Sequence, residues 1–169
     1  MKKWAPLILV LLAPVCFSQE KQKNIQYTPN IANGEKLYQT NCAMCHGSKG
    51  MSDTALGKAL SKKPAAIGDP VVLNRLSPEK VFQVITQGFS DKGMPGFKHL
   101  DPKERWDMAA YVFTLNCNSQ KPAPEVKPSF TWNETKAQTD SQLIDIIKKR
   151  GVPDKHIQEE LAAARFIIE

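Results

Sequence analysis

The sequence is short of the residues that mark several classes of protein. It has only 4 cysteines in 169 residues, too few and too unevenly placed for a scaffold held together by disulfides. The net charge is +6, but no run of five or more like charges occurs. A nucleic-acid partner would favour a clustered basic stripe, so we expect no nucleic-acid binding. No alternating pattern with a tight turn predicts a β-hairpin, which favours an all-α protein.

The sequence also lacks an apolar run long enough to span a membrane. Lys2 and Lys3 give a positive start, and an uncharged, largely apolar run over residues 4–17 precedes a polar stretch after Ser18. This run is shorter than the ~20 residues of a spanning helix. The pattern is typical of an export signal at 1–18, so we expect a periplasmic protein that is soluble after cleavage. A retained membrane anchor or a lipid on Cys16 are the alternatives.

The rest of the chain divides by composition into four segments. A polar lead covers residues 19–29, and a compact helical unit covers about 30–117. A segment that contains prolines follows at 118–139, and its composition favours an extended linker. A helical extension covers residues 140–169, and no internal repeat is visible.

Three helices are predicted in the compact unit from their caps and their apolar spacing. The first covers about 31–41. The second begins after Ser77 as its N-cap and stops at Gly88. The third begins after Asp101, where Glu104 completes a capping box. All three have apolar residues at helical spacing.

The helical extension is too small to be stable alone. Its apolar spacing predicts two amphipathic helices, with the break between them at Gly151 and Pro153. Because a hairpin of this size buries little surface, we expect it to dock on the compact unit, on a second copy of itself or on a partner protein. Phe130 and Trp132, in the linker before it, are expected to cover a neighbouring apolar surface.

Cys42, Cys45 and His46 form the most informative motif. Two thiols separated by two residues can add to the two vinyl groups on one edge of a porphyrin. The histidine directly after the second thiol is then held against the iron. The motif occurs once, so these residues predict one covalently attached haem c with His46 as an iron ligand.

Three other interpretations of this motif are kept open. A redox dithiol would follow a strand, whereas these cysteines follow a predicted helix and lead into a glycine-rich loop. A zinc site would need further ligands, but Cys117, His99 and His156 are single and scattered. Chance occurrence in a loop is the third alternative. We interpret Cys117 as a buried thiol near the end of the third helix and His156 as a surface residue.

Met94 is the candidate ligand for the other face of the iron. It stands between Gly93 and Pro95, neighbours that suit a loop better than a core helix. Such a loop can bring a thioether sulfur to a fixed point, and His99 is the alternative ligand. With both axial positions filled, the iron has no open site, and a sulfur ligand raises its potential. The site therefore favours transfer of single electrons, and we expect no catalytic residue.

Residues 30–117 resemble a class I c-type cytochrome of the small bacterial type. The resemblance is carried by these segments, in order: 34–38, 42–47, 94–95 and 106–112. It implies an all-α cytochrome c fold, with a three-helix core around one covalent haem, followed by the linker and the helical hairpin. In this family the first and last helices cross at a glycine, so Gly34 is expected to approach the last helix near Met108 and Tyr111.

The resemblance also implies roles for particular residues. Cys42 and Cys45 are expected to carry the haem thioethers. His46 and Met94 are expected to bind the iron. Family members often use a proline carbonyl to accept the other N–H of the histidine, and Pro64 is the candidate here.

The function implied is that of an electron carrier, not an enzyme. We expect a periplasmic single-electron carrier with one redox protein as donor and another as acceptor. The alternative is a dedicated cytochrome subunit, docked to an oxidoreductase or a membrane respiratory complex through residues 140–169. Self-association through these C-terminal helices is a further option. A haem peroxidase or gas-binding protein is the third function considered, and it would need an iron position that opens.

Overall fold

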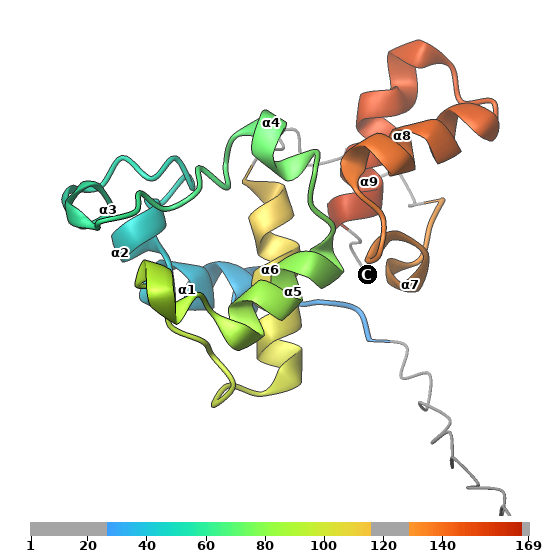
Figure 1. Cartoon of the computed structure of the whole chain (residues 1–169). Coiled ribbons are helices and arrows are strands. Elements are labelled where there is room, and N and C mark those ends of the chain that lie inside the picture. The colour runs from blue at the N-terminus through green and yellow to red at the C-terminus, as the bar shows by residue number, and fades with distance from the viewer. Residues whose placement is uncertain (1–26, 116–128, 167–169) are drawn as a thin grey trace, which may run out of the picture.

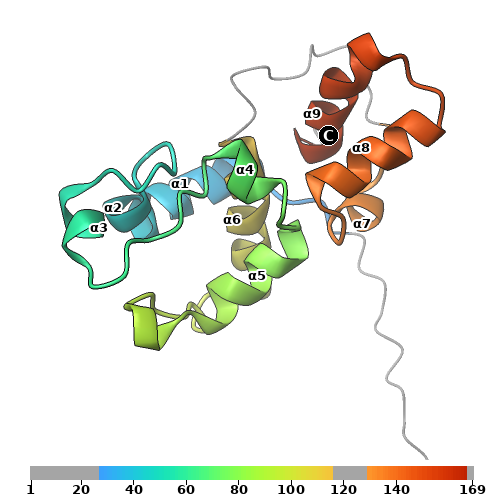
Figure 2. The same cartoon turned by 45° about the horizontal axis from the view of Figure 1, so that its top comes forward.

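The computed structural model describes residues 27–115 and 129–166, and the regular elements of these residues are helices (Figure 1). Helices α1 to α6 form one group, and α7 to α9 form a second group at the other end of the molecule (Figures 1 and 2). The all-α prediction is confirmed. None of the described helices combines the length and the apolar character needed to cross a membrane.

Helix α1 (Ile31–Asn41) crosses helix α6 (Pro102–Thr114) at a glycine. A Cβ atom built on Gly34 would lie 2.1 Å from the carbonyl oxygen of Asp107 and 3.0 Å from the Cβ of Tyr111. Only a residue without a side chain lets the two backbones come this close. The expected close approach of the first and last helices is confirmed.

Helix α5 (Pro78–Gln87) packs against α6 and completes the core. Its N-cap is Ser77, and it ends at Gly88, whose φ is 69°. The ring of Phe82 stacks on that of Trp106, with ring centroids 4.2 Å apart. The predicted bounds of α5 are confirmed, and α6 begins at the predicted capping box and ends one residue before Leu115.

Short helices connect α1 to α5 and surround the same core. They are α2 (Ala43–His46), α3 (Ala55–Ala59) and α4 (Pro70–Leu73). The buried apolar side chains of the group come mostly from α5 and α6: Tyr38, Leu73, Val81, Ile85, Phe97, Met108, Ala109, Tyr111, Val112 and Phe113.

The end of the predicted polar lead is tied to α6. The hydroxyl of Tyr27 donates to the buried carboxylate of Asp107. The backbone N–H of Asn30 donates to the same carboxylate at 2.7 Å, and so does the side-chain amide of Asn33, also at 2.7 Å. Because these donors satisfy its oxygens, the carboxylate can be buried at the helix crossing.

The C-terminal group has a core of its own. It contains α7 (Trp132–Thr135), α8 (Asp140–Lys149) and α9 (Ile157–Phe166). Its buried apolar side chains are Phe130, Leu143, Ile147, Ile157, Leu161 and Ala164. The buried guanidinium of Arg165 pairs with Asp140 at 2.7 Å and thus joins the end of α9 to the start of α8.

This group docks on the first one. The ring of Trp132 meets that of Trp106 edge to face, with centroids 5.9 Å apart. The backbone N–H of Glu79 donates to the carbonyl of Lys136 at 2.9 Å. Among the three docking modes considered for the extension, the structure therefore shows docking on the compact unit of the same chain.

The structure differs from the predicted extended linker at residues 129–139. Helix α7 lies there, and it begins after Thr131, whose backbone N–H and hydroxyl both donate to the carboxylate of Glu134, at 2.7 and 2.9 Å. Phe130 and Trp132 are both buried, as expected for aromatics that cover an apolar surface. The predicted signal segment with Cys16, residues 19–26 of the polar lead, and residues 116–128 with Cys117 lie outside the described residues.

Candidate functional site

The cysteine and histidine motif occupies one helical turn at the junction of α1 and α2. Cys42 ends α1, and its N–H donates to the carbonyl of Tyr38 at 2.8 Å. The N–H groups of Cys45 and His46 then both donate to the carbonyl of Cys42, at 3.1 and 2.9 Å. Both thiols are free and partly buried. The turn therefore holds the two sulfurs and the imidazole in a fixed relative position.

Helices on either side hold this turn in place. The buried hydroxyl of Tyr38 donates to the carbonyl of Gly47 at 2.8 Å, just after the motif. Thr54 donates through its hydroxyl to the carbonyl of Cys45 at 3.1 Å. A Cβ on Gly57 would lie 2.5 Å from that carbonyl, so α3 packs directly on the motif.

The imidazole of His46 is oriented by a backbone carbonyl. Its Nδ1 lies 3.0 Å from the carbonyl oxygen of Ala65. Since a carbonyl can only accept, Nδ1 carries the hydrogen and Nε2 keeps its lone pair. Burial lowers the pKa of His46, although the bond to Ala65 acts in the opposite direction. A neutral imidazole with a free Nε2 is the form that binds a metal ion.

The prediction for Pro64 is corrected by one residue, because the carbonyl that meets His46 belongs to Ala65. Every residue has a carbonyl group, so the path of the loop decides which one faces the ring. The same oxygen of Ala65 also accepts the hydroxyl of Ser52 at 2.8 Å and the N–H of Ile67 at 2.9 Å.

Met94 lies on a closed loop that follows α5. After a 3-10 turn, η1 (Ser90–Lys92), its backbone pairs with that of Phe89 through N–H···O bonds of 2.9 and 3.1 Å. A Cβ on Gly96 would lie 2.7 Å from the carbonyl of Gln87, so the loop packs tightly on the end of α5. The partly buried Met94 is therefore held on a well-defined loop.

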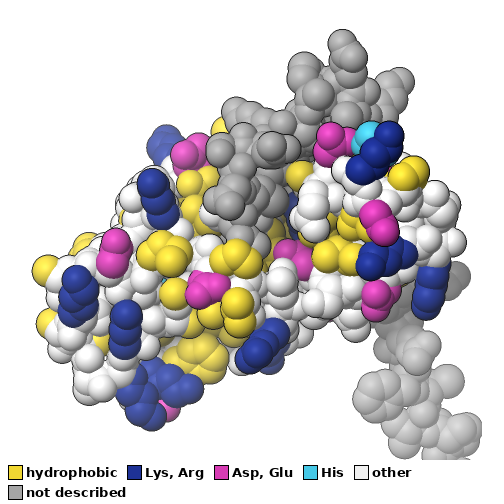
Figure 3. All heavy atoms as spheres, turned by 90° about the horizontal axis from the view of Figure 1, so that it is seen from above, with side chains coloured by type: hydrophobic (Ala, Val, Ile, Leu, Met, Phe, Trp, Pro, Cys, Tyr) yellow, Lys and Arg dark blue, Asp and Glu magenta, His cyan; other side chains and the backbone are white. Residues whose placement is uncertain are grey.

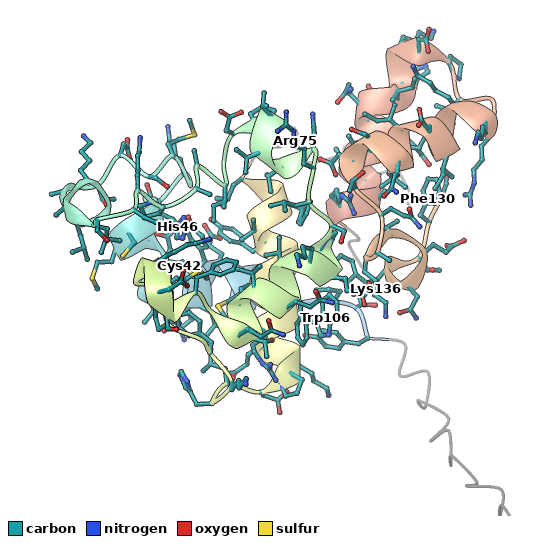
Figure 4. All side chains as sticks on the ribbon, in the orientation of Figure 1. Cys42, His46, Arg75, Trp106, Phe130 and Lys136 are labelled. Carbon is teal, nitrogen blue, oxygen red and sulfur yellow. The ribbon has the colours of Figure 1, made fainter. Side chains whose placement is uncertain are left out.

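The Met94 loop and the motif lie at the same end of the molecule. In Figures 1 and 2 the yellow-green loop after α5 and helices α2 and α3 share one end, and α7 to α9 lie at the other. Figure 4 shows Cys42 and His46 side by side, far from the labelled Lys136 and Phe130. The structure thus places the proposed ligands from segments distant in the sequence at one end of the fold.

The two other histidines lie apart from this motif. His99 is exposed, and its ring lies 5.9 Å from that of Phe97. His156 is exposed and pairs with Glu159 at 2.9 Å, as expected for a surface residue. Across residues 27–115 and 129–166, no three His, Cys, Asp or Glu side chains converge as a metal-binding group.

Cys42 does not have the electrostatics of a redox-active thiol. Burial, with a smaller contribution from Cys45, raises the pKa of Cys42 to about 12. A reactive dithiol needs a depressed pKa, so that one sulfur is a thiolate near neutral pH. What the turn does offer is two free thiols beside a neutral imidazole, the set of groups that fits a porphyrin attached through its vinyl groups.

Sequence reasoning missed Ser52. It is fully buried, and its φ of 53° makes it the sole non-glycine residue with positive φ among those described. Nothing in its immediate sequence marks it, because the signal is a contact with Ala65 across the loop.

Residues 29–112 match the family model described as cytochrome C oxidase, cbb3-type, subunit III. The match begins just before α1 and ends within α6, so it includes the motif and Met94 and stops before the C-terminal helices. No curated protein matches the chain.

Proposed function

Because residues 29–112 belong to the class I c-type cytochromes, we propose that this chain is a periplasmic single-electron carrier with one covalent haem c. The family implies haem-based electron transfer. The proposal adds that Cys42 and Cys45 carry the thioethers and that His46 and Met94 are the axial ligands. The periplasmic location rests on the predicted export signal at residues 1–18.

The observation that carries this proposal is the state of His46. Its Nδ1–H is bonded to a backbone carbonyl, burial lowers its pKa, and it stands one residue after the second thiol. Haem would be held here by two thioether bonds and by Nε2 of the imidazole, and it would supply an iron that cycles between ferrous and ferric states.

Met94 is supported as the sixth ligand by the construction of its loop. A loop closed by paired backbone hydrogen bonds and packed on the end of α5 restricts where the sulfur can lie. A bound thioether blocks the position that oxygen or peroxide would use, which favours electron transfer over bond chemistry.

The surface at the motif end supports docking to a redox partner. Met44 and Leu56 are exposed apolar residues on α2 and α3, with exposed fractions of 65% and 42%. Lys49 and Lys58 are exposed on the same segment. The face shown in Figure 3 carries basic side chains interspersed with acidic ones. Exposed apolar residues and lysines on one segment fit a partner whose docking surface is apolar with an acidic rim.

The alternative is a dedicated subunit of an oxidoreductase or membrane respiratory complex. The matched family model is itself described as an oxidase subunit, and this description supports the alternative function. Fractionation of cells that contain the intact protein distinguishes the two functions. A carrier is released with the periplasmic contents, whereas a subunit stays with a solubilised membrane complex through size-exclusion chromatography.

The proposal is tested with the mature protein and its Met94→Ala variant. Both are expected to keep haem after extraction with acidic acetone and to show the mass of the polypeptide plus one haem. Only the variant is expected to lose the sulfur-ligand absorption band and to have a lower reduction potential. Haem that is extracted from the unaltered protein would contradict covalent attachment, and an unchanged band in the variant would exclude Met94 as a ligand.

A further inference from the structure

Ser52 adopts a backbone conformation that ordinarily belongs to glycine. Its φ of 53° lies in the left-handed region, and its side chain is fully buried in the loop after the motif. Its N–H donates to the carbonyl of His46 at 2.7 Å, so the residue sits directly against the histidine. A non-glycine residue in such a conformation points to something that its side chain does.

What the side chain does is share the hydrogen-bond acceptor of His46. The hydroxyl of Ser52 donates to the carbonyl of Ala65 at 2.8 Å, and Nδ1 of His46 donates to the same oxygen at 3.0 Å. The N–H of Ile67 is a third donor, at 2.9 Å. A carbonyl oxygen has two lone pairs, so three donors compete for it. Each one weakens the bonds made by the others.

We propose that Ser52 is a positioning residue that limits how strongly Ala65 can accept the Nδ1–H of His46 and thereby raises the reduction potential of the haem. The inference rests on the proposed function, in which His46 binds iron. A stronger Nδ1–H···O bond makes the imidazole a better electron donor, which stabilises ferric iron. Because the Ser52 hydroxyl occupies part of the Ala65 carbonyl oxygen, the Nδ1–H bond of His46 is weaker and the imidazole donates less electron density to the iron.

The test uses full-length, haem-loaded Ser52→Ala and Ser52→Gly proteins. Both lose the hydroxyl, so Ala65 is left to His46 and Ile67. At a fixed applied potential, the ratio of ferric to ferrous protein is expected to rise by about three- to tenfold, the size that corresponds to strengthening one hydrogen bond. In the ferrous protein, the proton resonance of His46 Nδ1–H should move downfield in both variants.

Ser61→Ala is the matched control. It removes a serine hydroxyl from an exposed position between the motif and Ala65 and leaves the three donors to Ala65 unchanged. Its ferric-to-ferrous ratio is expected to stay within about twofold of the unaltered protein. Gly favours the backbone conformation of residue 52, so Ser52→Gly carries the test if Ser52→Ala fails to mature.

The outcomes separate this inference from the proposed function. An unchanged or higher potential in Ser52→Gly, with haem still covalently bound, overturns the role of Ser52 and leaves the proposed function standing. A lower potential in Ser52→Ala alone would assign the effect to backbone strain and also overturn it. Absence of covalent haem in the unaltered protein overturns the proposed function and this inference together.

Discussion

Tyr38 shows how a single side chain supports the candidate site. It is fully buried next to Gly34, its ring lies 5.3 Å from that of Tyr111, and its hydroxyl reaches the carbonyl of Gly47 beyond the motif. Burial raises the pKa of this hydroxyl, with smaller contributions from Cys42 and Tyr111. Burial therefore favours the protonated hydroxyl, the form that can donate to the carbonyl of Gly47.

We expect Tyr38→Phe to lower the free energy of unfolding at neutral pH by about 1–3 kcal/mol, because the carbonyl of Gly47 loses its buried donor. The folded pKa of Tyr38 lies above the ordinary value of about 10, so its contribution is full below pH ~10 and is lost as pH rises above it. The difference between the two proteins should therefore shrink above pH ~10. Denaturant unfolding across this range measures both effects, and a difference that grows with pH would contradict the assignment.

At the scale of elements, the crossing of α1 and α6 decides the shape of the core. The two backbones touch at Gly34, and the buried carboxylate of Asp107 lies at the same crossing with donors from Tyr27, Asn30 and Asn33. Neither helix can move away without breaking these bonds.

Gly34→Ala should destabilise the protein by about 1–3 kcal/mol or more, because its methyl group would lie 2.1 Å from a backbone oxygen that cannot turn aside. Ala32→Ser, at an exposed position on the same helix, is the control and should change stability by less than about 0.5 kcal/mol. Denaturant unfolding of the haem-loaded proteins provides the comparison. Equal stability of the two variants would show that the helices do not meet at Gly34.

For the whole molecule, the main feature is that the C-terminal helices are docked at the end away from the motif. Trp132 packs on Trp106, and the ammonium of Lys136 lies 5.8 Å from the centre of the Trp106 ring. The guanidinium of Arg165 lies 4.8 Å from the centre of the Phe113 ring. Within the part of the chain that the structure describes, the extension thus packs on α6 and does not cover the motif end (Figure 1).

We expect Trp132→Ala to loosen this docking without altering the haem site. The loss of a buried indole should lower stability by about 3–5 kcal/mol, and the helices destabilised should be mainly α7 to α9. Hydrogen exchange followed by mass spectrometry should show faster exchange in residues 129–166, while the optical spectrum and potential stay unchanged. Gln158→Ala, at an exposed position on α9, is the control and should change exchange little. A shifted potential in Trp132→Ala would show that the two ends are coupled.

The sequence by itself determined the elements whose causes are local. Caps, first-turn prolines and apolar spacing act within a few residues, and they predicted α1, α5 and the start of α6 as the structure has them. The spacing of Cys42, Cys45 and His46 is also local and marked the motif, whereas the short helix α2 within it was not predicted.

The tertiary structure alone decided what depends on the path of the chain through space. The sequence indicated Pro64 as the source of the carbonyl that meets His46, whereas that carbonyl belongs to Ala65. Backbone carbonyls are chemically alike, so only the folded loop distinguishes them. Sequence reasoning missed Ser52, whose partner lies across that loop, and it read α7 as linker, although burial of Trp132 against α6 stabilises a helix there. Contacts between distant segments have no local pattern, so only the fold could reveal them.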